Sequence, residues 1–102
     1  MTRKRAIQAT GPSRAAIDDA LRAVLVHALG LDPDRVADFD RETGLFGHLP
    51  ELDSMAVATL LTEIEDRLAV TIEDDEVDGE MLETYGALLA FVEAKTLRST
   101  LL

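Results

Sequence analysis

The chain has 102 residues, of which 20 are acidic and 10 basic, and its net charge is −10. This length fits one domain with a modest core, and a hydrophobic content of 47% is enough for the chain to fold. The absence of cysteine excludes disulfides, thiolate nucleophiles and cysteine-ligated zinc. Any thiol chemistry must therefore use a thiol that a cofactor supplies.

The charge is unevenly distributed. Residues 1–14 hold four basic residues and no acidic ones, so residues 15–102 carry a net charge of −14. Such a body repels nucleic acid and anionic membranes and attracts basic protein surfaces. No stretch is long and apolar enough for a membrane span or a signal peptide. We expect a cytoplasmic protein with no nucleic-acid partner and no membrane span, and we expect a monomer.

The first helix is predicted over residues 13–30, after a flexible basic tail at residues 1–12. Ser13 is a good N-cap residue, and Gly30 suits the position that ends a helix. Between these two residues, the apolar side chains recur at helical spacing: Ile17, Leu21, Val24, Leu25, Ala28 and Leu29.

A long connection follows at residues 31–52, where no periodicity is sustained. It contains two prolines and two glycines among scattered acidic residues, which indicates a loop. A loop of this length in a small domain is usually functional or packed down by its own side chains.

A second helix begins at Asp53 or Ser54 and has an apolar stripe of Val57, Leu61, Ile64 and Leu68. Residues 73–80 form at most a short third helix, and Thr84 caps a last helix. The pattern predicts an all-α, four-helix bundle with a long loop between its first two helices and a short third helix.

The domain boundaries follow from these elements. We expect the folded domain to span residues 13–95 and residues 96–102 to form a frayed C-terminal tail.

The segment Asp53-Ser54-Met55 carries the chemistry. A serine at a helix N-terminus is accessible, and the backbone amides and helix dipole there favour a phosphate on its oxygen. Asp53 accepts hydrogen bonds from first-turn amides in this arrangement, and Met55 places an apolar contact beside the serine oxygen. A phosphodiester at Ser54 is therefore physically favourable.

In this helical frame the segment resembles the acyl carrier protein family, which includes the carrier domains of polyketide and peptide synthetases. The family motif is Asp-Ser followed by Leu or Met at the start of the second helix of a four-helix bundle. Here the motif is Asp53-Ser54-Met55, and the last helix opens with the sequence TYGAL at residues 84–88. The resemblance covers roughly residues 13–95.

The resemblance implies that Ser54 is the attachment site for 4′-phosphopantetheine, with Asp53 and Met55 flanking it. A separate phosphopantetheinyl transferase would transfer this arm from coenzyme A with Mg²⁺, and the thiol of the arm would hold an acyl group as a thioester. The chain would then be a carrier and not an enzyme, with no catalytic residue and no metal site.

The implied partners are the transferase and the acyl-loading and acyl-using enzymes. Their basic docking patches would meet the second helix, where Glu63, Glu65 and Asp66 form an acidic partner surface.

The motif also departs from the family pattern. Many members have a glycine three residues before the serine, whereas this chain has Glu51. Two helix positions that are often acidic in fatty-acid carriers are Ala56 and Thr59. These departures favour a specialised lipid, polyketide or exopolysaccharide-linked pathway over housekeeping fatty-acid synthesis. The run LPELDSMAV at residues 49–57 is similar to carriers associated with bacterial exosortase and exopolysaccharide gene clusters.

A calcium-binding module is one alternative. The first half of an EF-hand loop is matched at its positions one, three, five and six by Asp74, Glu76, Asp78 and Gly79. The twelfth position, which should be a bidentate glutamate, is Tyr85.

Two further alternatives concern Ser54 itself. A serine hydrolase that pairs Ser54 with His48 or His27 would lack the Gly-x-Ser-x-Gly elbow. A plain helical adaptor, in which Ser54 is an ordinary N-cap or first-turn serine, would share every fold feature and lack only the modification. Met55, Leu60 and Leu61 either pack in the core or line a cavity for an acyl chain.

Overall fold

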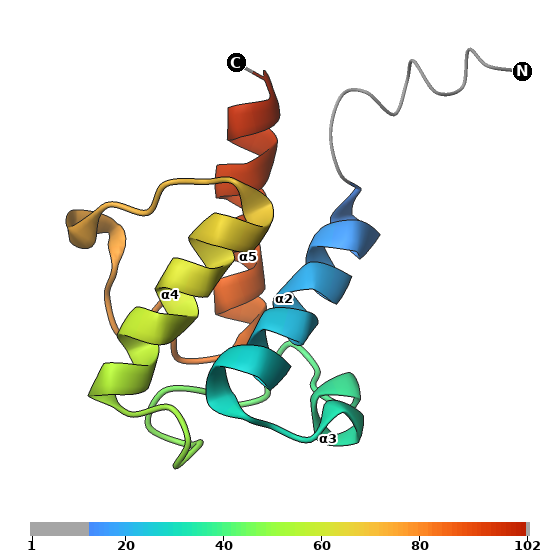
Figure 1. Cartoon of the computed structure of the whole chain (residues 1–102), viewed down its shortest axis with the longest axis vertical. Helices are drawn as coiled ribbons and strands as arrows, with labels where there is room; N and C mark the ends of the chain where they lie inside the picture. The colour runs from blue at the N-terminus through green and yellow to red at the C-terminus, as the bar shows by residue number, and fades with distance from the viewer. Residues whose placement is uncertain (1–12, 102) are drawn as a thin grey trace, which may run out of the picture.

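The computed structural model describes residues 13–101. This part of the chain forms four α-helices and one 3₁₀ turn: α2 (Arg14–Leu29), α3 (Pro33–Ala37), α4 (Ser54–Leu68), η1 (Asp74–Glu76) and α5 (Tyr85–Leu101). Helix α2 contacts each of the other three helices, so the bundle is built around it (Figure 1). The all-α, four-helix prediction is confirmed. The predicted basic tail at 1–12 lies outside the described residues.

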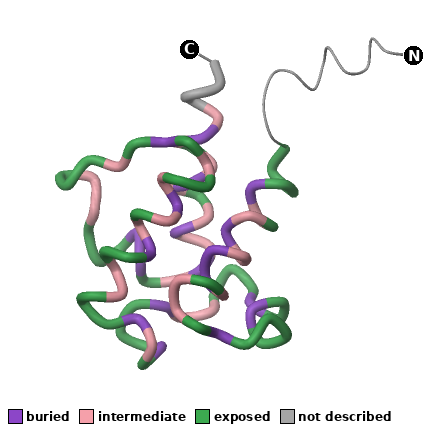
Figure 2. The backbone as a smooth tube through the Cα atoms, in the orientation of Figure 1, coloured by how far each residue is buried: buried purple, intermediate pink, exposed green. Residues whose placement is uncertain are grey.

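The core fills the space between the helices. Apolar side chains from every helix are buried, whereas the segment around η1 is largely exposed (Figure 2). The fully buried side chains of the three long helices are Ile17, Leu21, Val24 and Leu25 of α2, Leu60 and Ile64 of α4, and Tyr85, Leu88 and Val92 of α5. Among the described helices, none is long and apolar enough to cross a bilayer.

The helix ends follow the predicted caps. The hydroxyl of Ser13 accepts a hydrogen bond from the amide of Ala16 over 3.1 Å. Gly30 ends α2 in the left-handed conformation at φ 68°, which glycine adopts without steric cost. The hydroxyl of Thr84 accepts from the amide of Ala87 over 3.1 Å at the start of α5.

The long connection contains a short helix, α3, that the sequence pattern does not predict. Asp32 caps it by accepting from the amide of Asp34 over 2.9 Å, and Pro33 occupies its first position, where a missing amide hydrogen costs nothing. The helix has only five residues, too few for a hydrophobic period to show. Val36 is its buried residue.

Arg22 of α2 holds this connection against the bundle. Its guanidinium donates to the carbonyl oxygens of Val36 over 2.6 Å and of Phe39 over 3.1 Å. The same group donates to both oxygens of Asp18 and lies 4.7 Å from the ring centroid of Tyr85. Arg22 therefore joins α2, the end of α3 and the start of α5.

Asp18 and Tyr85 complete this cluster. The tyrosine hydroxyl donates to the Asp18 carboxylate. Burial, reinforced by this bond, raises the pKa of Tyr85. Partial burial alone would raise the pKa of Asp18, but the hydrogen bonds from Tyr85 and Arg22 outweigh it and lower that pKa. The carboxylate form of Asp18 is therefore the one that the fold selects.

The second half of the connection pairs with the segment that leads into α5. The amide of Leu45 donates to Glu83 over 2.8 Å and that of Phe46 to Leu82 over 2.9 Å. In return, the amide of Gly86 donates to the carbonyl of Arg41 over 2.9 Å. The long loop is thus packed down, as its length predicts.

The short third helix is the three-residue 3₁₀ turn Asp74–Glu76, and Glu76 pairs there with Lys95 of α5 at 2.8 Å. One expectation for the C-terminal half needs correction, namely the end of the last helix. Helix α5 continues to Leu101 and does not end near residue 95. Thr96 is buried and Leu97 packs against the core, so the packed helix continues beyond residue 95, where a frayed tail was expected.

Replacing Gly86 with alanine should lower the free energy of unfolding by a net ~1–2 kcal/mol, even after the gain in helix propensity. An added Cβ would lie 2.8 Å from the carbonyl oxygen of Arg41, so the paired backbone must shift. Urea unfolding followed by circular dichroism measures the change. Gly79→Ala is the matched control, because a Cβ there meets no atom within 4 Å. Equal losses in the two variants would contradict the contact.

The cluster of Asp18, Arg22 and Tyr85 should make the stability of the fold depend on pH. Because the pKa of Asp18 is lowered by folding, its stabilising contribution is complete above about pH 5 and is lost as the pH falls below ~4. The stability difference between wild type and Asp18→Asn, measured by urea unfolding, should therefore be largest near neutral pH and shrink toward pH ~3. Asp19→Asn, which removes an exposed neighbouring charge, is the control, and its stability difference from wild type should not shrink comparably toward low pH. A stability difference between wild type and Asp18→Asn that stays the same at every pH would refute this account.

Candidate functional site

Ser54 is the first residue of α4 and is exposed. Asp53 is the N-cap: its carboxylate accepts from the amide of Ala56 over 2.8 Å, and its carbonyl accepts from the amide of Val57 over 3.0 Å. Ser54 is therefore not the cap, and its hydroxyl is not used to hold the helix. Of the two positions considered for a plain serine, the N-cap and the first turn, Ser54 occupies the first-turn position.

The amides beside this hydroxyl are also available. Within the described part of the chain, the amides of Ser54 and Met55 donate to no protein group. They lie at the positive end of a 15-residue helix, where a phosphate oxygen is stabilised by free amides and by the helix dipole. The residues present thus fit a phosphodiester on the serine oxygen.

Ser54 stands between two hollows. The hollow on the loop side is lined by Phe46, Gly47, His48, Leu49, Pro50, Leu52, Asp53 and Ser54. The other is a groove of about 500 Å³ between α4 and the link around η1, lined by Ser54, Val57, Ala58, Leu61, Thr62, Glu65, Ile72, Asp74 and Val77. An arm attached to the serine has open, largely uncharged space on both sides.

The segment before the serine is fixed by its own residues. Leu49 and Leu52 are buried, and the amide of Leu52 donates to the carbonyl of Leu49 over 3.0 Å. Glu51, which replaces the glycine of many family members, accepts from Arg35 of α3 over 3.1 Å. A hydrogen bond from its own backbone amide and the Arg35 guanidinium lower the pKa of Glu51. The sequence offers no sign of this pair, because sixteen residues separate its members.

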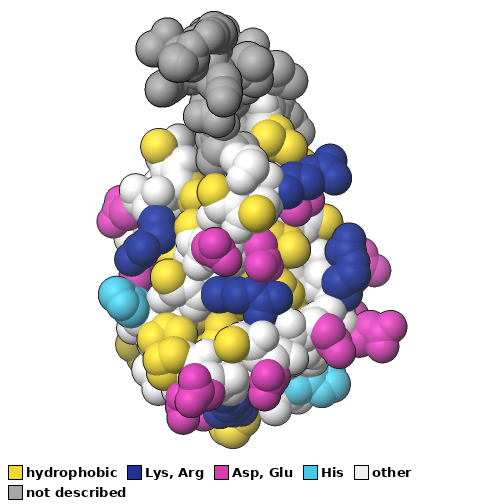
Figure 3. Space-filling model, turned by 90° about the vertical axis from the view of Figure 1, so that its right-hand side faces the viewer, with side chains coloured by type: hydrophobic (Ala, Val, Ile, Leu, Met, Phe, Trp, Pro, Cys, Tyr) yellow, Lys and Arg dark blue, Asp and Glu magenta, His cyan; other side chains and the backbone are white. Residues whose placement is uncertain are grey.

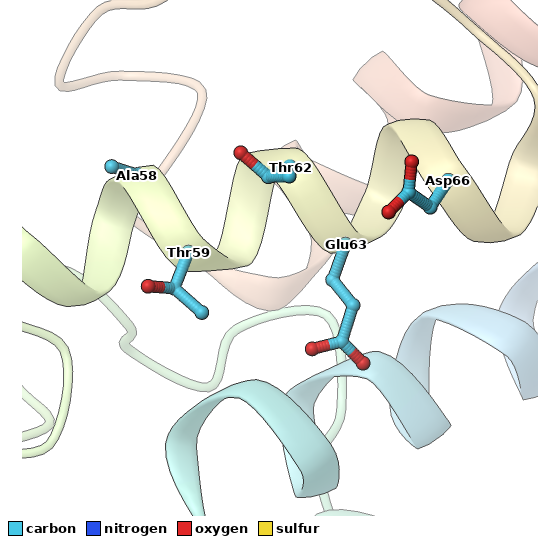
Figure 4. Close-up of a pocket in the computed structure, with 5 residues that line it drawn as sticks. All are labelled: Ala58, Thr59, Thr62, Glu63 and Asp66. Carbon is cyan, nitrogen blue, oxygen red and sulfur yellow. The ribbon is translucent and has the colours of Figure 1, made fainter.

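The outer face of α4 is shallow and has small side chains. Ala58, Thr59 and Thr62 line a hollow there with Glu63 and Asp66 (Figure 4). The side chain of Glu63 points toward α2, and its carboxylate lies 3.9 Å from the imidazole of His27. His27, in the last turn of α2, thus faces an acidic side chain of the neighbouring helix.

The three predicted acidic residues do not form one surface. Glu63 and Asp66 line the outer hollow of α4, but Glu65 turns to the other side, where its carboxylate accepts from the amide of Ile72 over 2.7 Å. Glu65 therefore holds the link that follows α4. Its involvement was missed because a side chain-to-backbone bond across seven residues leaves no periodic signal.

The apolar residues of α4 differ in how far they are buried. Leu60 is fully buried, as expected for core packing, and Leu61 is partly buried. Met55 is 81% exposed, so the interpretation that it packs in the core is wrong.

Three residues of the calcium alternative are engaged elsewhere. Glu76 pairs with Lys95, Asp78 accepts from the amide of Met81 over 2.9 Å, and Tyr85 is buried beside Asp18. Over the described residues, no three acidic or histidine side chains are placed to hold a metal ion together.

The serine hydrolase alternative requires a hydrogen bond between Ser54 and a histidine. In residues 13–97, neither His27 nor His48 is hydrogen-bonded to Ser54. His48 packs instead against Gly44, where a Cβ would lie 2.4 Å from its ring.

Asp53→Ala should lower the free energy of unfolding by about 1 kcal/mol, because it removes the cap of α4. Ser54→Ala should change it by less than about 0.5 kcal/mol, because the serine hydroxyl holds no helix amide. Asp53→Asn keeps an accepting oxygen and is the control for the cap. Urea unfolding of the three variants measures these differences, and a larger loss for Ser54→Ala than for Asp53→Ala would contradict the assigned cap.

Comparison with known proteins agrees with this geometry. A family model described as a phosphopantetheine attachment site matches residues 19–92, which include the whole site. Among solved structures, the chain is similar to a holo acyl carrier protein from Nitrosomonas europaea, with 37% sequence identity and a TM-score of 0.69. That match covers 78% of this chain and 93% of the other. The chain therefore belongs to the acyl carrier protein family, whose cofactor is a covalently attached 4′-phosphopantetheine, and it is a carrier and not an enzyme.

Proposed function

We propose that this carrier holds its 4′-phosphopantetheine on the oxygen of Ser54 and presents an acyl group to partner enzymes. The observation that carries this proposal is the exposed hydroxyl of Ser54 at the first position of α4, inside the matched region and beside two first-turn amides that have no partner among the described residues.

The chain's own residues prepare the serine for modification. Asp53 caps α4 through the amide of Ala56, which leaves the serine oxygen free to react. In the transfer, this oxygen would bond to the pantetheine-side phosphorus of coenzyme A, the pyrophosphate bond would break to release adenosine 3′,5′-bisphosphate, and the serine proton would pass to the transferase. The free amides of Ser54 and Met55 then face the phosphate oxygens of the new diester. The buried Leu49 and Leu52 hold the preceding segment in place.

When bound, the arm supplies the thiol that this cysteine-free chain lacks. The contribution of the protein is to tether and to present: a tether raises the effective concentration of the acyl group at the active site of each partner. Because a hollow lies on each side of Ser54, the base of the arm can extend either toward the loop before α4 or toward the groove beside η1.

Membership of the family implies a phosphopantetheinyl transferase and acyl-handling enzymes as partners. We propose that Glu63 and Asp66, exposed to different degrees on the outer face of α4, meet basic patches on these enzymes. The uncharged residues Ala56 and Thr59 near the serine support a specialised lipid, polyketide or exopolysaccharide-linked pathway.

Incubation of the full chain with coenzyme A, Mg²⁺ and a promiscuous phosphopantetheinyl transferase should raise its intact mass by one phosphopantetheine moiety. Ser54→Ala should gain no mass, while circular dichroism shows an unchanged helical fold. Tandem mass spectrometry of the modified peptide locates the attachment.

Ser13→Ala is the matched control, because Ser13 is another exposed serine at a helix N-terminus but serves as a cap. It should be modified like wild type. Modification of Ser54→Ala, or an unmodified wild type with an intact fold, would overturn the proposed attachment.

A further inference from the structure

The two hollows beside Ser54 differ in charge. Two carboxylates, Glu65 and Asp74, line the groove beside η1, and no basic side chain lines it. Asp53 and His48 are the ionisable residues that line the loop-side hollow. Among the described residues that line either hollow, His48 is therefore the one that can carry a positive charge. An anionic group on the serine oxygen would meet a different electrostatic field on each side.

Backbone contacts fix the position of His48 in the loop. Its amide donates to the carbonyl of Leu45 over 2.9 Å, and the amide of Leu45 donates to Glu83 over 2.8 Å. Gly47 turns the chain just before it at φ 90°, a conformation that glycine adopts without steric cost. The imidazole lies over Gly44, where an added Cβ would lie 2.5 Å from its Cδ2 atom. The glycine therefore leaves the space that the ring occupies.

His48 differs from the other histidine of the chain in its surroundings. His27 lies 3.9 Å from the carboxylate of Glu63, whereas none of the ion pairs among the described residues includes His48, which is exposed. The chain has two histidines, and Figure 3 shows them on opposite sides of one face, with acidic and basic side chains between them. The ring of His48 can therefore bind a group that enters the loop-side hollow.

We propose that His48 holds the phosphate of the arm and directs the base of the arm into the loop-side hollow. The inference rests on the proposed function, because it assumes that the phosphate is attached to Ser54. An imidazole N–H donates to a phosphate oxygen, and a protonated imidazole makes this a charge-assisted hydrogen bond. The amides of Ser54 and Met55 stabilise the phosphate from the helix side, and His48 binds it from the loop side.

The carboxylates of the groove act in the same direction. Glu65 is fixed on that side because it accepts from the amide of Ile72 over 2.7 Å, and Asp74 is exposed. Both charges repel an anionic phosphate. The Asp53 carboxylate points instead to the first turn of α4, where a backbone amide and the positive helix end offset part of its charge. The phosphate is thus favoured on the loop side.

Nuclear magnetic resonance of the full chain in its apo and holo forms tests the direction of the arm. In the holo form, with the arm transferred from isotopically labelled coenzyme A, nuclear Overhauser effects should connect the gem-dimethyl group nearest the phosphate with the ring of His48. Contacts of this group with Ile72 or Val77, which line the groove, would overturn the inference. The absence of any contact with His48 would overturn it as well.

The phosphorus resonance of the holo form tests the charge of the imidazole. An imidazole gains a proton between about pH 8 and pH 5.5, whereas a phosphodiester gains none in this range. The phosphorus chemical shift should therefore change across this range in wild type. His48→Gln keeps a hydrogen-bond donor but cannot become charged, so it should abolish the change. Circular dichroism should show the same helical fold, because His48 is exposed.

His27→Gln is the matched control, because it removes the other histidine, which faces Glu63 and lines neither hollow. Its phosphorus shift should change with pH as in wild type. A change that persists in His48→Gln, or that is lost in both variants, would overturn the role of His48 and leave the attachment to Ser54 standing, since both variants would still carry the arm. Failure of wild type to accept the arm would remove the proposed function and this inference together.

Discussion

The guanidinium of Arg22 is the group on which the arrangement of this small domain depends. Its donors reach the carbonyl oxygens of Val36 and Phe39 and the carboxylate of Asp18, and its plane lies over the ring of Tyr85. One side chain of the central helix thereby donates to the carbonyl of Phe39 and adds a second donor to that of Val36, which also accepts from the amide of Phe39. Five donors in a fixed planar fork make arginine suited to this position, and lysine could not replace it.

The long connection becomes a rigid support for the serine because it is held at three places. Arg22 holds its first half, backbone pairing with the segment before α5 holds its second half, and Leu49 and Leu52 are buried just before α4. Three carboxylates near the serine have separate structural roles, since Asp53 caps α4, Glu51 binds Arg35 and Glu65 holds the link to η1. The hydroxyl of Ser54 is left without a structural role, as the proposed modification requires.

Charged and apolar side chains both surround the serine. Asp53, Glu65 and Asp74 line the hollows that Ser54 also lines, whereas Met55 and Phe46 are exposed apolar residues. Long-range attraction falls off within about a Debye length of ~8–10 Å and acts mainly on the encounter rate. Short-range apolar contact acts on the lifetime of the complex. A carrier that must meet several enzymes in turn gains from rapid encounter and from contacts that distinguish partners by shape.

The sequence by itself determined the features that arise within one helical turn. Ser13, Gly30, Asp53 and Thr84 end or begin their helices as predicted, because a cap spans three residues and its donor and acceptor are set by local geometry. The motif at residues 53–55 and its helical frame were likewise readable, so the family and the proposed attachment serine could be predicted from the residues.

Only the tertiary structure decided which side chains have partners and which are exposed. The Arg22 cluster joins residues up to 67 positions apart. The carboxylate of Glu65 accepts a hydrogen bond from the amide of Ile72, which lies beyond the end of α4. Helix α3 is too short for a hydrophobic period, and α5 continues beyond residue 95 because Thr96 is buried and Leu97 packs against the core. A methionine at position 55 is compatible with a core or a surface position. Because Leu60 and Ile64 are the buried residues of α4, Met55 lies on the exposed side of the helix. Exposure is a property of the assembled bundle, because it depends on neighbours that the chain brings together only by folding.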